Sequence, residues 1–166
     1  MADTREIETK FWKALKDDRT LMLGLPDVDD GRAQPMTAQL DDWEDESRPA
    51  AIYIFTSKDT DLAQDIGDGR RFTANFAAKG HELFASFEGE VRPFNDASTI
   101  ERLWNPFVAA WFEGGKDDPK LLLLRLEPED AHIWLNENSL FAGVRLLLGR
   151  DPKKDYEGKT AEVHLA

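Results

Sequence analysis

Two apolar segments that end in hydroxyl, amide and cationic side chains are the part of this sequence best suited to chemistry. The first covers residues 34–39 (QPMTAQ) and the second covers residues 51–58 (AIYIFTSK). Two strands with such ends can cradle a flat, partly polar ring that carries a phosphate tail. The chain has no cysteine and no cluster of side chains at metal-ligand spacing. Any redox chemistry would therefore require an organic cofactor.

The sequence offers no pattern for a metal site or for nucleophilic catalysis. His81, His132 and His164 are isolated from one another, so we expect no metal. Residues 27–31 (DVDDG) resemble the start of a calcium loop, but the spacing and the downstream bidentate glutamate are missing. No glycine-rich phosphate motif occurs. The sequence therefore leaves any catalytic residue unknown.

The formal net charge of −12 limits the partners of this chain. Nucleic-acid binding needs a concentrated basic face, and only short basic pairs such as Arg70-Arg71 occur. Residues 1–16 mix both charge signs without an apolar core, and the aliphatic cluster at residues 121–124 is far shorter than the about 20 residues of a membrane span. We expect a cytoplasmic protein with no nucleic-acid or membrane partner.

The apolar periodicity and the turn residues predict many short strands and few helices. We expect an N-terminal helix over about residues 4–17, a short helix over 58–66 that ends at Gly67, and a hairpin of strands 70–78 and 81–91. The other predicted strands are 20–25, 34–40, 50–56, 120–126, 131–135 and 160–165, with a turn at 127–130 and an acidic loop at 41–48.

Two more helices are predicted in the second half of the chain. Ser98-x-x-Glu101 has the pattern of a capping box, and Trp104 and Trp111, seven residues apart, are expected on one face of the helix that follows, with a kink at Pro106. Ser139 opens a last amphipathic helix, so a C-terminal helix and strand occupy about residues 139–166. The whole chain, residues 1–166, is expected to be one domain. Few parallel crossovers are possible, and a small, mostly antiparallel barrel with peripheral helices is favoured.

The order of these motifs resembles the pyridoxamine 5'-phosphate oxidase-like split-barrel flavoproteins, and among them the general stress protein branch. The resemblance rests on residues 34–37, 54–57, Asn75-Phe76 and, most specifically, the stretch from Trp104-Asn105-Pro106 to residues 111–119 (WFEGGKDDP). It implies a mainly β (α+β) fold, a six- to seven-stranded antiparallel split β-barrel with peripheral helices. It also implies a homodimer that holds FMN at its interface.

Carried over residue by residue, the resemblance implies a set of flavin contacts. Two positions depart from relatives, because Gln34 is often arginine and Leu62 is often lysine in the family. Arg32 and Lys58, with free backbone N–H groups at residues 58–60, are expected to take over phosphate binding. The candidate cofactor contacts are Arg32, Gln34, Met36, Thr37, Thr56, Ser57, Lys58, Thr60 and Trp111.

Three functions follow as hypotheses. The first is an FMN-dependent oxidoreductase that takes electrons from a reduced nicotinamide or another donor. The second is a non-catalytic flavin-binding or sensing module, and the third is a dimeric protein that has lost the cofactor. Pyridoxamine-phosphate oxidase activity itself is not expected, because residues 151–166 lack the arginine-rich substrate segment that the resemblance would require.

Overall fold

The computed structural model of the protein describes residues 4–42, 49, 51–136 and 160–165. Within these residues the strands form one antiparallel sheet in the order β2-β1-β4-β5-β6-β3, and β7 pairs with β6. The strands are β1 (Thr20–Gly24), β2 (Gln34–Thr37), β3 (Ile52–Ser57), β4 (Arg70–Ala77), β5 (Leu83–Pro93), β6 (Leu121–Leu135) and β7 (Thr160–His164). The helical elements are α1 (Thr4–Asp18), η1 (Asp29–Gly31), α2 (Asp61–Ile66), α3 (Ala97–Leu103), α4 (Pro106–Ala109) and η2 (Gly115–Asp117).

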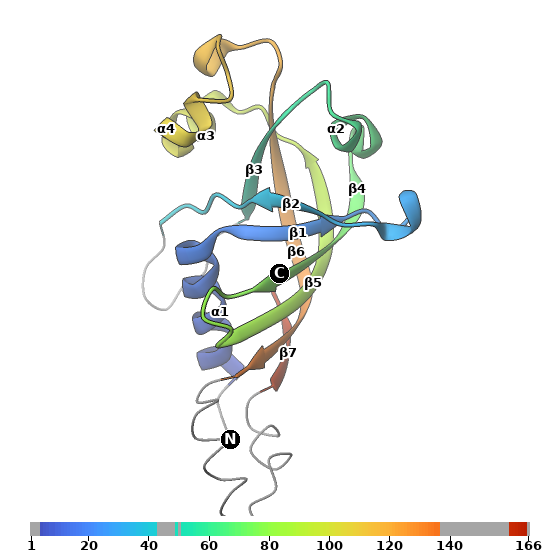
Figure 1. Ribbon diagram of the computed structural model, residues 1–166, viewed down its shortest axis with the longest axis vertical. Helices are drawn as coiled ribbons and strands as arrows, with labels where there is room; N and C mark the ends of the chain where they lie inside the picture. The colour runs from blue at the N-terminus through green and yellow to red at the C-terminus, as the bar shows by residue number, and fades with distance from the viewer. Residues whose placement is uncertain (1–3, 43–48, 50, 137–159, 166) are drawn as a thin grey trace, which may run out of the picture.

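The sheet curves into a nearly closed barrel that is split between β2 and β3 (Figure 1). Among the described residues, one isolated backbone pair joins the two sides of this seam. Gln39 N–H donates to the Tyr53 carbonyl at 2.7 Å, and Tyr53 N–H donates to the Gln39 carbonyl at 2.9 Å. The edges of β2 and β3 on either side of that pair therefore face each other without a ladder. The predicted split-barrel fold is confirmed.

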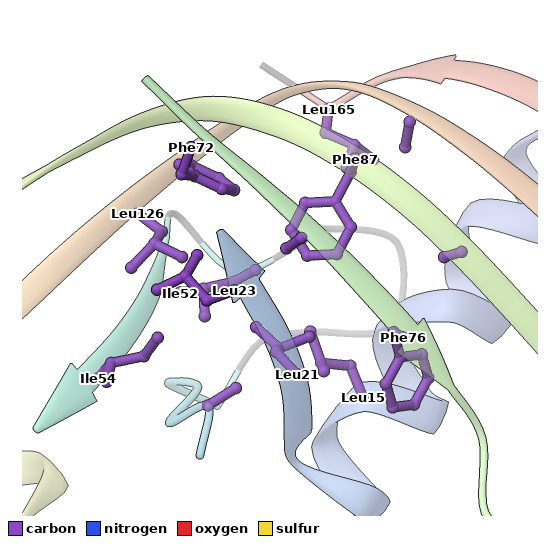
Figure 2. Packing of buried hydrophobic residues seen from close by; sticks show 14 of the residues in the cluster. Leu15, Leu21, Leu23, Ile52, Ile54, Phe72, Phe76, Phe87, Leu126 and Leu165 are labelled. Carbon is purple, nitrogen blue, oxygen red and sulfur yellow. The ribbon is translucent and has the colours of Figure 1, made fainter. Parts of the chain in front are cut away.

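Alternation along the strands fills the barrel with apolar side chains (Figure 2). On β3, Ile52 and Ile54 point inward and are fully buried, while Tyr53 points to the outer face. Helix α1 covers one end, where the Phe11 ring lies 5.5 Å from the Phe87 ring in an edge-on arrangement. This helix follows its predicted amphipathic spacing, with Ile7, Phe11 and Leu15 among its buried residues.

A second, smaller apolar cluster lies outside the barrel, where α3 and α4 cover β3 and β6. Its members are Ala51, Tyr53, Ile100, Leu103, Val108, Phe112, Leu121 and Leu123. Leu122 and Leu124 belong instead to the barrel interior. The leucine run at residues 121–124 is therefore buried on both faces of β6, as expected for a central strand that is covered on two sides.

The predicted turn at residues 127–130 is wrong, because β6 runs through it as one strand from Leu121 to Leu135. Pro128 lies opposite Gly89 of β5, and the register shifts between Phe87 and Gly89. Proline is tolerated within a sheet at such an irregularity. A Cβ atom on Gly89 would collide with the carbonyl oxygen of Glu127, so this close approach of the two strands requires glycine.

The single kinked helix predicted after Ser98 is also wrong. Asp96, not Ser98, is the N-cap of α3, and its carboxylate accepts a hydrogen bond from Thr99 N–H at 3.0 Å. The helix ends at Leu103, and Asn105 starts α4 anew by accepting from the N–H groups of Phe107 and Val108. Trp104 and Trp111 therefore do not share a helix face. The helix predicted from Ser139 lies outside the described residues.

None of the described helices is long and apolar enough to cross a membrane.

Candidate functional site

A cavity of about 450 Å³ opens at the seam between β2 and β3. We call it the seam cavity. One wall comes from β2 and the residues after it, one from the end of β3 and the loop before α2, and one from α4 and the residues after it. It is lined by Pro35, Met36, Thr37, Gln39, Phe55, Thr56, Ser57, Thr60, Phe107, Val108, Trp111 and Phe112.

The polar part of the seam cavity consists of four hydroxyl side chains and the amide of Gln39. Thr37 lies at the end of β2, and Thr56 and Ser57 close β3. Thr60 is the N-cap of α2, since its hydroxyl accepts from Ala63 N–H at 3.1 Å and donates to the Ser57 carbonyl at 2.9 Å. The helix predicted from residue 58 thus begins three residues later, at Asp61, and the hydroxyl of Thr60 is held in a fixed direction.

The apolar part of the seam cavity is largely aromatic. Phe112 is buried, and Phe55 packs edge-on against Trp104 with ring centroids 6.1 Å apart. Phe107 and Trp111, in contrast, are 83% and 84% exposed. Among the described residues they are the two most exposed large apolar side chains, and both stand at the cavity wall.

The α3–α4 segment that carries these aromatics is tied to the seam by polar contacts. The Arg102 guanidinium donates to both carboxylate oxygens of Asp41, at 2.7 and 3.0 Å. This hydrogen bond to Asp41 raises the pKa of Arg102. Asn105 Nδ2 also approaches Gln39 Oε1 at 3.4 Å. The residues after β2 and the start of α4 are therefore held together directly beside the opening.

A second hollow of about 510 Å³ adjoins the seam cavity, and Thr60 lines both. We call it the acidic hollow. Besides Arg32 and Gln34, its lining includes residues at the end of β1 and on α2. Its carboxylates are those of Asp29, Asp59, Asp61 and Asp65.

The structure brings six of the nine predicted contact residues to one cavity: Met36, Thr37, Thr56, Ser57, Thr60 and Trp111. Arg32 and Gln34 line the acidic hollow instead. The Lys58 side chain is exposed and lines neither space. The two groups of residues meet at Thr60.

The expectation of free backbone N–H groups at residues 58–60 is wrong. Lys58 N–H donates to the Lys120 carbonyl at 2.8 Å, and Thr60 N–H donates to the Ser57 carbonyl at 3.1 Å. Asp59 N–H points to Ser57 Oγ at 3.4 Å. The loop between β3 and α2 uses these donors for its own turn and for the strand beside it.

Sequence reasoning missed several lining residues of the seam cavity. They are Pro35, Gln39, Phe55, Phe107, Val108 and Phe112. Most of them lie within or next to the segments that carried the predictions, so proximity to Met36 or Trp111 was the available signal. Among the described residues, no group of three or more His, Cys, Asp or Glu side chains is arranged to hold a metal ion.

Comparison with known proteins agrees with this architecture. The family model described as "Pyridoxamine 5'-phosphate oxidase like" matches residues 6–155. General stress protein 26 of Bacillus subtilis (strain 168) is 31% identical over 85 residues, which cover 49% of this chain and 60% of that protein. The chain thus spans less than two thirds of that relative's length.

Two solved structures from Xanthomonas are more similar. A general stress family protein from X. campestris pv. campestris is 56% identical, with a TM-score of 0.75, over 84% of this chain and 93% of that one. The general stress FMN/FAD binding protein from X. citri is 55% identical, with a TM-score of 0.74, over 82% and 93%. The chain belongs to the pyridoxamine 5'-phosphate oxidase-like family, in its general stress protein branch.

Proposed function

We propose that this protein binds FMN in the seam cavity of a homodimer and that the bound flavin is redox-active, with a reduced nicotinamide as a candidate electron donor. The observation that carries the proposal is the composition of the cavity walls. Hydroxyl groups of Thr37, Thr56, Ser57 and Thr60 face an apolar, largely aromatic wall. A flavin has the same division between a flat ring and a hydroxylated chain. The volume of about 450 Å³ lies within the range of small-molecule sites, about 300–1,000 Å³.

The lining residues fit the parts of the cofactor in an order that follows the chain. The edge of β2 at Met36 and Thr37 faces the seam without a ladder partner, so its backbone groups are available to the ring. The ribityl chain would follow Thr56 and Ser57 toward Thr60. When bound, the flavin supplies the redox chemistry, and the protein binds and orients it. Arg32, Gln34 and Lys58 are the predicted contacts at the phosphate end.

The homodimer is supported by the two exposed aromatic side chains at the cavity. Phe107 and Trp111 are more than four-fifths exposed in the single chain, and aromatic residues are enriched at interfaces. A second copy that covers them would also close the mouth of the seam cavity. The X. citri relative, which is described as FMN/FAD binding, supports a flavin as the ligand.

One observation favours the second candidate function, a flavin-binding or sensing module without turnover. No ionisable side chain is among the described residues that line the seam cavity. General acid–base catalysis needs a group within hydrogen-bond reach of the reacting atom, although hydride transfer to a flavin does not require one. The third candidate, loss of the cofactor, is favoured only by the neutral side chains at Gln34 and Leu62.

Three measurements separate these functions. Absorption spectra of the purified protein, taken before and after addition of FMN, test whether a flavin binds at all. Absence of binding at saturating FMN would establish the third candidate. Anaerobic mixing of the flavin-loaded protein with a reduced nicotinamide then separates the first two, because only a redox-active protein loses its visible flavin absorption. Light scattering during gel filtration tests the homodimer.

A further inference from the structure

The phosphate end of the proposed flavin site faces negatively charged side chains, which disfavour an anionic phosphate. These charges affect which flavins the protein binds. The argument rests on the proposed function, because it concerns the same cavity. Thr60 lines both the seam cavity and the acidic hollow. A ribityl chain that follows Thr56 and Ser57 to Thr60 therefore places its terminal phosphate beside the acidic hollow.

The backbone donors of the loop between β3 and α2 are already used within the chain. The N–H groups of Lys58, Asp59 and Thr60 are already directed at Lys120 and Ser57, as described above. The Thr60 hydroxyl donates its only hydrogen to the Ser57 carbonyl. A phosphate oxygen needs donors, and the neutral side-chain donors that line this end are Thr56, Ser57 and Gln34.

The charges nearby repel an anion. Among the described residues that line the acidic hollow, Arg32 is the one cation, and four carboxylates line the same space. Lys120 Nζ lies 3.3 Å from the carboxylate of Asp59 and offsets that charge. Lys58 is exposed and lines neither space. Charges that lie within about 8 Å are not screened away by physiological salt, and a phosphate carries about −1.5 to −2.

We infer that this protein recognises the ring and the ribityl chain of a flavin and gains little net affinity from the phosphate. The carboxylates that line the acidic hollow, among them Asp61 and Asp65 of α2, determine this specificity. Riboflavin, which has the same ring and chain but no phosphate, is therefore a ligand of similar affinity and competes with FMN for the seam cavity.

Titration of the purified homodimer with FMN and with riboflavin, followed by quenching of flavin fluorescence, tests the inference. We expect the two dissociation constants to agree within about tenfold, whereas two charge-assisted hydrogen bonds to the phosphate would separate them by more than about 100-fold. The salt dependence of the FMN affinity is an independent test. Because salt screens repulsion, the affinity for FMN should rise or stay constant as salt is added, and it would fall if cations held the phosphate.

Variants that each remove one carboxylate test which residues repel the phosphate of FMN. Asp65→Asn should tighten FMN binding by about threefold or more and leave riboflavin binding unchanged. Asp61→Asn should act in the same direction, and it serves as the second variant if Asp65→Asn fails to fold, because Asp61 is exposed. Asp17→Asn is the matched control. It changes the net charge equally, lies exposed on α1 and lines neither space, so it should change neither affinity.

The outcomes are distinct. FMN binding that is more than about 100-fold tighter than riboflavin binding, or a ratio of the two affinities that neither variant changes, would overturn the inference while the proposed function stands. A protein that binds neither flavin would refute the proposed function and the inference with it. Lys58→Ala adds a check. A threefold or greater loss of affinity for FMN but not for riboflavin would show that this lysine holds the phosphate, and it would overturn the inference.

Discussion

Replacing Trp111 with alanine is the sharpest test of how the seam cavity is completed. Trp111 stands at the cavity wall, and 84% of it is exposed in the single chain. An exposed side chain contributes little to the stability of its own protomer. The substitution should therefore leave the fold of the protomer intact, and its effect should fall on the interface of the proposed homodimer.

The magnitude follows from the area that a partner would cover. A tryptophan buries up to about 250 Å², so about 200 Å² of Trp111 remains to be covered. At about 25 cal/mol per Å² this burial corresponds to about 5 kcal/mol as an upper value. Interface tryptophans that are truncated cost about 2–4 kcal/mol in practice, because association has its own entropic cost. In a twofold-symmetric dimer both copies lose the side chain, so the dimer should dissociate at least about 1,000-fold more readily.

Sedimentation equilibrium of wild type and Trp111→Ala measures this change directly. Thermal unfolding at a dilution where both are monomeric should give equal midpoints. Phe84→Ala is the control, since Phe84 is another partly exposed aromatic residue, 36% exposed, and lies outside the seam cavity. A dimer of Trp111→Ala as tight as the wild type would refute the assignment of this aromatic wall to the interface. A fall in the monomer's midpoint would show that the residue supports its own chain instead.

Three further predictions concern the cavity and its frame. Thr56→Val should weaken FMN binding by about 1–2 kcal/mol in fluorescence titration, and Thr56→Ser should restore it, because one hydroxyl hydrogen bond is at issue. Gly89→Ala should lower the free energy of unfolding, measured with urea, by about 1–3 kcal/mol, because the new Cβ atom clashes with the carbonyl oxygen of Glu127. Gly69→Ala is the control. Its Cβ atom would lie 3.7 Å from the nearest neighbour, so the free energy of unfolding should change little. Hydrogen bonds from Thr99 and Ser98 lower the pKa of Asp96 below 3.8. The stability that this N-cap contributes is therefore fully present above pH 3.8 and is lost as the pH falls through the folded pKa. Asp96→Ala should lower the melting temperature at neutral pH, and its difference from wild type should vanish in strong acid.

Local sequence patterns were sufficient to predict most of the barrel. The apolar segment predicted as a strand over residues 50–56 contains most of β3, and the helical spacing of Ile7, Phe11 and Leu15 defines α1. These signals are local, so a single sequence contains them. The grouping of six predicted contacts in the seam cavity, in contrast, came from the family resemblance and not from periodicity.

The parts that sequence reasoning missed depend on distant partners. Pro128 lies among turn-forming residues, and only its pairing opposite Gly89 keeps it within a strand. The spacing of Trp104 and Trp111 indicates one face only if the helix is continuous, but Asn105 caps a new helix between them. The N–H of Lys58 is occupied by a carbonyl more than sixty positions away in the chain, at Lys120. Local patterns contain none of this information.

The leucine run on β6, apolar on both faces, makes one backbone segment a shared wall of two hydrophobic layers. Leu122 and Leu124 fill the inside, and Leu121 and Leu123 anchor the outer layer on which α3 and α4 rest. The position of the aromatic residues that line the seam cavity on α4 and after it therefore depends on the buried core of the molecule and not on its loops. A volume change inside the barrel at Leu122 should consequently be transmitted to the wall of the seam cavity, so mutations remote from this cavity can alter its shape.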